Sequence, residues 1–172
     1  MLRAYKIGVV FFSFVCVLLI AAAILPKEVV IVRTSIFKAS SSEIFEQVNN
    51  IENWPNWMPW IKQDSTIKLE FSKIIEDGNT HYIWSNSNND KGELKILKSE
   101  TNTFVITEVR FGDIPPVEGK WEFEETAEGT IVTWSKKLIL EYPLTIMGPM
   151  LDGAMGADLE TGLQNLKDYT SQ

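Results

Sequence analysis

Indole side chains are concentrated in one short stretch of this chain. Three of its six tryptophans, Trp54, Trp57 and Trp60, lie three residues apart, with Pro55 and Pro59 between them. Indoles can recognise a ring-shaped ligand, but buried indoles more often fill a protein core. Pro59 disfavours helical geometry at the preceding residue, so no regular helix runs through the stretch, whereas Pro55 can open one short turn. We predict a compact tryptophan motif that closes a helix, leads into a sheet and helps to seal an apolar space.

Few side chains of the chain offer acid–base chemistry. His81 is the single histidine and precedes Tyr82 in a predicted strand, so the two side chains point to opposite faces. An inward Tyr82 therefore leaves His81 outside, which argues against a catalytic histidine. Glu108 and Arg110 share one strand face, where they either pair inside a cavity to orient a polar group or form a solvated ladder. No catalytic residue is assigned.

The cysteine and charge content excludes several kinds of site. Cys16 and His81 are the only cysteine and histidine, so neither an intrachain disulfide nor a zinc site with several such ligands can form. Carboxylate sites for a hard cation stay compatible with this count, but the prediction is of no metal and no cofactor. From Pro26 onward the chain has 14 basic and 23 acidic residues, a net charge of −9. Such a surface repels phosphates, which argues against nucleic acid as a partner.

The N-terminal region contains an uncharged apolar run over residues 7–25, long enough to cross a bilayer as a helix. Arg3 and Lys6 precede the run, and the positive-inside tendency places the N-terminus in the cytoplasm. A cleavable signal peptide is the alternative, because residues 21–23 are alanines that suit a cleavage site. The apolar run continues to Leu25, which favours a membrane anchor over 1–27. We predict a single-pass membrane protein with one monomeric domain, 28–172, outside the cytoplasm.

Two amphipathic helices are predicted in this domain. Ser40 stands three residues before Glu43, as in a capping box, and opens a short helix that ends near Asn49 or Asn50. A longer helix begins near Pro149, and its apolar stripe consists of Leu151, Met155, Leu159, Leu163 and Leu166. Glycines at 148, 153, 156 and 162 weaken this helix, so packing on the sheet must hold it and its first half can bend or move.

Period-two patterns predict an antiparallel sheet and an α+β fold. Residues 28–37 are rich in β-branched side chains and form the first strand. Six further strands follow between Ser65 and Tyr142, with turns or loops at 76–79, 86–91, 101–102, 112–116 and 128–129. Such short connections imply an antiparallel meander whose two faces differ in polarity. Several candidate inward residues are aromatic, so we expect a bulky apolar concave face.

This order of elements resembles the helix-grip fold, and more narrowly the SRPBCC superfamily of START and polyketide-cyclase-like proteins. Three motifs carry the resemblance: Trp54-x-x-Trp57-x-Pro59-Trp60, Gly129-Thr130-x-Val132-x-Trp134 and Gly162-Leu163-x-x-Leu166-Lys167. The resemblance covers about 29–167. It implies a sheet wrapped around the C-terminal helix with an apolar cavity between them. Members bind lipids, sterols, hormones, polyketides or quinones, and a minority are enzymes without a shared catalytic constellation, so no catalytic residue is carried over.

The candidate ligand contacts are aromatic and apolar side chains of the tryptophan motif, the concave sheet face and the start of the last helix. Core packing and ligand lining are hard to separate for these residues, and methionines suit adaptable pockets and irregular core gaps equally well. The candidates are Trp54, Trp57, Trp60, Tyr82, Trp84, Phe111, Trp121, Trp134, Met147, Met150, Leu151, Met155 and Leu159.

Three functions follow as hypotheses. The leading one is a membrane-anchored module that binds an apolar small molecule or lipid at the membrane surface, opened by the start of the last helix and the 112–116 loop. The alternative is a cyclase, dehydratase or hydrolase that acts on an apolar substrate in the same cavity, with Tyr82, Glu108 and Arg110 as the residues to inspect. The third is an envelope interaction domain, for which an exposed apolar patch would be the sign.

Overall fold

A computed structural model describes residues 2–63, 65–72, 81–88, 90–112 and 114–171. The predicted turn at 76–79 lies outside these ranges. The elements, in chain order, are α1 (Leu2–Ile24), β1 (Glu28–Phe37), α2 (Ser41–Asn49), the 3₁₀ helix η1 (Ile51–Asn56), α3 (Pro59–Gln63), β2 (Lys68–Ser72), β3 (His81–Ser85), β4 (Lys91–Glu100), β5 (Phe104–Phe111), β6 (Ile114–Thr126), β7 (Gly129–Ile139), the 3₁₀ helix η2 (Leu144–Met147) and α4 (Gly148–Thr170).

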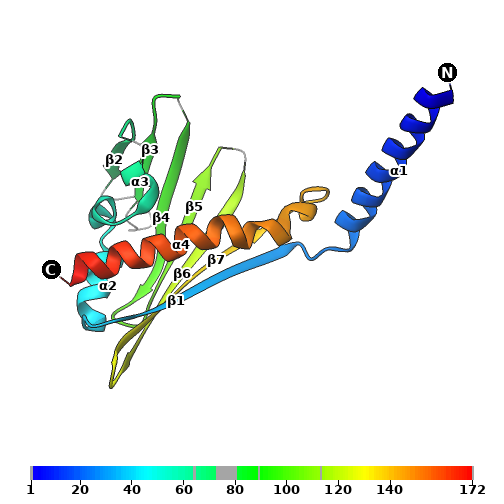
Figure 1. Cartoon of the computed structure of the whole chain (residues 1–172). Helices are drawn as coiled ribbons and strands as arrows, with labels where there is room; N and C mark the ends of the chain where they lie inside the picture. Colours follow the sequence, from blue (N-terminus) through cyan, green and yellow to red (C-terminus); the bar gives the residue numbers. More distant parts are fainter. Residues whose placement is uncertain (1, 64, 73–80, 89, 113, 172) are drawn as a thin grey trace.

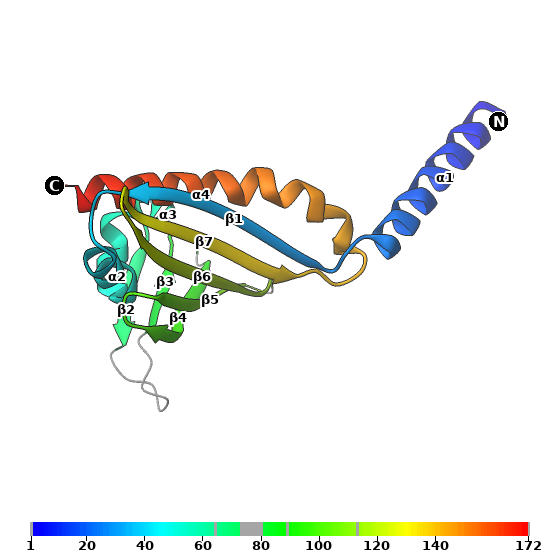
Figure 2. The same ribbon diagram turned by 90° about the horizontal axis from the view of Figure 1, so that it is seen from below.

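The seven described strands form one antiparallel sheet in the order β1-β7-β6-β5-β4-β3-β2. The sheet curves, and α4 runs along its concave side next to the edge strand β1 (Figures 1 and 2). Residues of β7 alternate between the two faces, with Val132, Trp134 and Leu138 buried on the concave side. The predicted α+β arrangement of a curved meander and a long C-terminal helix is confirmed.

Both predicted helices of the domain form close to their expected bounds. The Ser40 hydroxyl oxygen accepts a hydrogen bond from the Glu43 N–H at 3.3 Å. The Ser40 N–H donates a hydrogen bond to Glu43 Oε2 at 2.8 Å, and the two bonds together form the capping box. These bonds lower the pKa of Glu43 below its usual value. The helix ends at Asn49, and α4 begins at Gly148, one residue before the predicted start.

Two local predictions need correction. The tryptophan motif holds two short helical pieces rather than one turn: η1 contains Pro55, and Pro59 is the residue that opens α3 before the sheet begins. The first position of a helix tolerates proline, since its N–H has no helical partner. The predicted 112–116 loop is also shorter, because Phe111 pairs with Ile114 and β6 already begins there.

The second half of α4 packs tightly on the sheet. Leu159, Leu163 and Leu166 are buried in the main core. Gly162 lies directly over Trp134, since a Cβ built at Gly162 would approach the indole Cζ3 to 2.7 Å. This glycine therefore lowers helix propensity but allows a close approach between α4 and β7.

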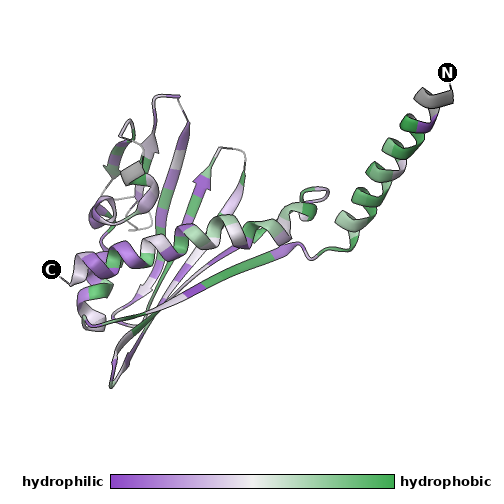
Figure 3. Cartoon of the chain, in the orientation of Figure 1, coloured by the Kyte–Doolittle hydropathy of each residue, from purple (hydrophilic) through white to green (hydrophobic). Residues whose placement is uncertain are grey.

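Helix α1 projects away from the domain, and most of its ribbon is hydrophobic (Figure 3). Over Lys6–Ile24 it is long and apolar enough to cross a membrane, and a signal sequence near an N-terminus would have the same properties. Its last turn touches the domain: Ala22 is buried, and its carbonyl accepts a hydrogen bond from the Thr145 hydroxyl of η2. The division into 1–27 and 28–172 stays a prediction.

Candidate ligand-binding site

A cavity of about 450 Å³ lies between the first half of α4, the 3₁₀ helix η2 and the ends of β5, β6 and β7. Its volume is within the range of small-molecule pockets, roughly 300–1,000 Å³. All lining residues among those that the structure describes are apolar: Val109, Phe111, Ile114, Pro115, Val117, Leu138, Leu140, Leu144, Met147, Leu151 and Met155. We call this space the outer cavity. The arrangement can take up an apolar molecule, and the described part of its wall offers no side chain for acid–base chemistry.

The outer cavity exists because α4 meets the sheet over only part of its length. Leu151 and Met155 continue the apolar stripe of α4 but stay half-buried, whereas the later stripe residues are fully buried. A register shift between Val109 and Phe111 interrupts the pairing of β5 with β6 at the same place. Such irregularities bend a strand locally, so the sheet does not follow the helix there.

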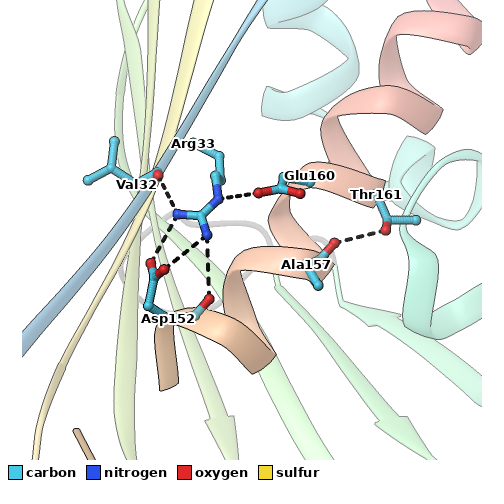
Figure 4. A network of polar contacts seen from close by, with 6 residues as sticks. All are labelled: Val32, Arg33, Asp152, Ala157, Glu160 and Thr161. Atoms are coloured by element: carbon cyan, nitrogen blue, oxygen red, sulfur yellow. Dashed lines mark hydrogen bonds and ion pairs between the residues drawn. The ribbon is translucent and has the colours of Figure 1, made fainter. Parts of the chain in front are cut away.

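Arg33 of β1 fixes the height of α4 above the sheet edge (Figure 4). Its Nε donates a hydrogen bond to Glu160 at 2.5 Å, and its Nη1 and Nη2 donate to the two carboxylate oxygens of Asp152 at 3.0 and 3.2 Å. Hydrogen bonds from Arg33 lower the pKa of Asp152 below its usual value. The two carboxylates stand two turns apart on α4, so one guanidinium ties the first half of the helix to β1.

A second, smaller cavity of about 60 Å³ adjoins the outer one. We call it the inner cavity; it shares Val109 and Val117 with the outer cavity. Its other lining residues come from the tryptophan motif and the centre of the sheet: Trp54, Met58, Trp60, Leu94, Thr107, Gly119, Trp134 and Lys136. The inner cavity thus brings polar groups to the deep end of an otherwise apolar space.

Lys136 is the functional candidate that the sequence analysis missed. It stands two residues after Trp134 in β7 and points to the same concave face, with Nζ 5.3 Å from the Trp134 ring centroid. Burial lowers the pKa of Lys136, and the charge of Asp158 on α4 acts in the opposite direction. The period-two pattern of β7 contained the signal, because a lysine two residues from an inward tryptophan must also point inward.

Replacing Lys136 with methionine is expected to raise the thermal stability of the ligand-free chain at neutral pH. The folded-state pKa lies below the unfolded one, so the unfolded chain binds more protons between the two values. Wild-type stability therefore rises with pH through that window, up to the ordinary lysine pKa of about 10.4, and the advantage of K136M shrinks. Melting curves between neutral pH and that value measure the difference.

The neighbouring Lys137 provides the control for this experiment. Its amine pairs with Glu28 at 2.7 Å, which raises the pKa of Lys137. K137M removes an exposed pair and should change stability little at neutral pH. The groups across the strands from Lys136, Ile31 and Gly119, are uncharged, which leaves Asp158 as its charged neighbour. A K136M protein less stable than wild type at neutral pH would contradict the prediction.

The structure distributes the sequence candidates over four locations. Phe111, Met147, Leu151 and Met155 line the outer cavity, while Trp54, Trp60 and Trp134 line the inner one. Met150 is 76% exposed and points away from both. The remaining candidates are buried in the core and line neither cavity: Trp57, Tyr82, Trp84, Trp121 and Leu159. Their assignment as ligand contacts has no support from these placements.

The proposed acid–base residues separate in the same way. Glu108 and Arg110 form an ion pair with a 2.6 Å contact, on the face of β5 opposite Thr107 and Val109, and so lie outside the cavities. Tyr82 points inward, and burial raises its pKa well above the usual value. His81 lies on the opposite face of β3, as its position next to Tyr82 predicts.

The mouth of the outer cavity lies beside the membrane-spanning candidate. Leu144 and Met147 of η2 line the cavity. Thr145 of the same 3₁₀ helix donates a hydrogen bond to the last turn of α1. The connection after α1 is also held to the domain, since the Leu140 N–H donates to the Lys27 carbonyl at 2.8 Å. The apolar helix and the apolar cavity therefore meet at one end of the domain.

A curved antiparallel sheet, a C-terminal helix across its concave face and a cavity between them define a helix-grip domain. Residues 37–167 match the sequence profile of the family described as "Polyketide cyclase / dehydrase and lipid transport". The chain belongs to this family, as the resemblance to the SRPBCC superfamily implied. No curated protein sequence matches the chain.

Solved structures agree with this fold. A START superfamily protein from Mycobacterium smegmatis is similar over 84% of this chain and 98% of its own, with TM-score 0.61 and 18% identity. A protein of unknown function, SA2116 from Staphylococcus aureus, covers 84% and 94% with TM-score 0.65 and 15% identity. The di-domain ARO/CYC protein StfQ from the steffimycin pathway has TM-score 0.65 at 10% identity over 84% of this chain and 51% of its own. At such identities the likeness establishes the fold alone.

Proposed function

We propose that this protein binds an apolar small molecule or lipid in the outer cavity, at the surface of a membrane. The observation that carries the proposal is the wholly apolar wall of a 450 Å³ space under the first half of α4. Burial of apolar ligand surface there would contribute about 25 cal/mol per Å² removed from water. Membership of a family that includes lipid-transport proteins supports the same function.

The position of the cavity mouth supports loading from the bilayer. Ile114, Leu144 and Met147 line the cavity and are each about half exposed, at 52%, 48% and 48%. Large apolar side chains exposed together mark a surface that contacts a partner or a membrane. Because α1 ends against η2, a bilayer that holds α1 would lie close to this rim. A hydrophobic ligand could then enter without crossing water.

Filling the outer cavity should abolish binding. Met155 lies in the cavity wall, so a tryptophan at this position would occupy ligand space. We expect M155W to reduce the bound fraction at least about tenfold, the scale of misfit in an apolar pocket. Native mass spectrometry of the full chain, purified from membranes in detergent, measures the fraction of molecules that carry a ligand and the mass of that ligand.

The matched control is M150W, on the same helix but 76% exposed. This variant introduces the same side chain outside the cavity and should retain the wild-type bound fraction. If M155W carried the same adduct as M150W and wild type, the ligand would lie elsewhere and the proposal would fail. Absence of any adduct in wild type, even after incubation with total membrane lipid, would count against it too.

A reaction on the bound molecule is the second candidate function. Lys136 is the only titratable side chain among the described residues that line the two cavities, and its lowered pKa suits a general base. The family description includes cyclases and dehydrases. A bound molecule that leaves the protein with unchanged mass and structure after long incubation would argue for binding alone.

A further inference from the structure

Lys136 is a cation placed at the deep end of an apolar space without an acidic partner. Among the described residues, no carboxylate lies within 4.0 Å of its Nζ, which stands over the Trp134 ring, 5.3 Å from the centroid. The other two lysines of β6 and β7 have such partners: Lys120 contacts Glu122 at 2.6 Å and Lys137 contacts Glu28 at 2.7 Å. Lys136 is half-buried, and a charge in such a place without a close acidic partner is costly, so a structural role explains Lys136 poorly.

The neighbours of Lys136 keep space and hydrogen-bonding groups beside it. Gly119 pairs with Lys136 on one side and with Thr107 on the other. A Cβ at Gly119 would lie 2.5 Å from Thr107 Oγ1, so the glycine leaves this spot open. The Thr107 hydroxyl has only a long hydrogen bond, 3.4 Å, to the Gly119 carbonyl. It can therefore turn to another acceptor at little cost.

The size of the inner cavity limits what can reach the amine. Its volume of about 60 Å³ is about twice the volume that one water molecule occupies in liquid water, roughly 30 Å³. A carboxylate fits such a volume, whereas a ring or a hydrocarbon chain does not. Val109 and Val117 line both spaces, so the outer cavity, which can hold the hydrocarbon part, lies directly beside the inner one.

We propose that the ligand is a long-chain carboxylate, bound with its acid group in the inner cavity against Lys136 and Thr107. This inference rests on the proposed function, because the hydrocarbon chain would occupy the outer cavity and point toward Leu144 and Met147 at the mouth. The ammonium and the carboxylate form a charge-assisted hydrogen bond in a nearly dry site, where such bonds are strong. The ligand thus supplies a counter-charge in direct contact with the amine, whereas Asp158 acts on Lys136 only through its more distant charge.

A competition between two probes of equal chain length tests this inference. The full chain in detergent is incubated with equimolar palmitate and 1-hexadecanol, and native mass spectrometry measures the ratio of the two adducts. Wild type should prefer the acid roughly tenfold to a hundredfold, the range of a hydrogen bond to a charged group. K136M should lose this preference but still bind the alcohol, while K137M should keep the wild-type preference.

The outcomes separate this inference from the proposed function. If neither probe binds to wild type, both fail. If wild type binds the two probes equally, or K136M still prefers the acid, the cavity binds ligands but the role of Lys136 is refuted. Melting curves show whether K136M is folded.

A measurement on wild type alone gives an independent check on ligand orientation. Tryptophans line the inner cavity (Trp54, Trp60 and Trp134), and no tryptophan lines the outer one. Stearate with a nitroxide near its carboxylate should therefore quench tryptophan fluorescence more strongly than stearate with a nitroxide at its far end. Stronger quenching by the far-end label would overturn the proposed orientation.

Discussion

Replacing Trp121 with alanine is expected to lower the free energy of unfolding by about 3–5 kcal/mol, the cost of truncating a buried tryptophan. Trp121 is fully buried and stacks on Trp134, with ring centroids 4.1 Å apart and planes 17° apart. It also makes edge contacts with Trp54 at 6.2 Å and Trp57 at 5.6 Å. Three other indoles therefore lose their packing partner at once, and the tightly packed interior cannot close the gap.

Urea unfolding of the full chain in detergent, followed by circular dichroism, measures this loss. The matched variant is Trp60→Ala: Trp60 is half-buried and contacts Tyr82 and Trp84 at centroid distances of 6.2 and 5.5 Å. Its loss should be clearly smaller, because part of the indole is already in water. If W121A kept near-normal stability and lost ligand instead, Trp121 would belong to the binding site and not to the core.

Replacing Gly129 with alanine is expected to cost about 3 kcal/mol or more, because two penalties act together. Gly129 has φ of +134°, which side chains other than glycine rarely adopt. A Cβ there would also lie only 2.1 Å from the Phe37 carbonyl oxygen on the adjacent strand β1. The backbone of β1 or β7 must shift to accommodate it, at the start of the longest strand pairing in the sheet.

Gly112 is the matched control, since it also has a positive φ, +52°, but a Cβ there meets no atom within 4 Å. G112A should cost only the left-handed penalty, about 1–2 kcal/mol. The two variants, compared by the same urea unfolding, separate backbone strain from steric clash. Equal losses would show that the contact with Phe37 relaxes easily and that only φ matters.

The fold could be predicted largely because its signals are local. The capping box of Ser40 and Glu43 and the leucine stripe of α4 depend on neighbours within one or two turns. Strand alternation placed Tyr82 and Trp134 inward and His81 outward, because successive side chains point to opposite faces. The same alternation places Lys136 inward, because it stands two residues after Trp134 in β7. Its charge alone would suggest a position in solvent.

The site could be predicted only in part. Four candidates, Phe111, Met147, Leu151 and Met155, lie in the outer cavity, while Trp57 and Trp121 lie in the core. Sequence identifies an apolar inward residue in both cases, and the hydrophobic effect does not distinguish a wall from a filled core. Whether an inward residue lines a cavity or lies in the filled core depends on whether another side chain occupies the space opposite it. The residue types alone do not reveal this.

By itself, therefore, the sequence determined the main helices and strands, their order and the face on which most strand side chains lie, since helix and strand periods and capping bonds act over a few residues. Only the tertiary structure decided where the domain is hollow. That outcome depends on the distance between α4 and the strands, which Gly162 makes short at one end and the β5–β6 register shift makes long at the other. Arg33 ties the helix to β1 through two carboxylates more than a hundred residues away.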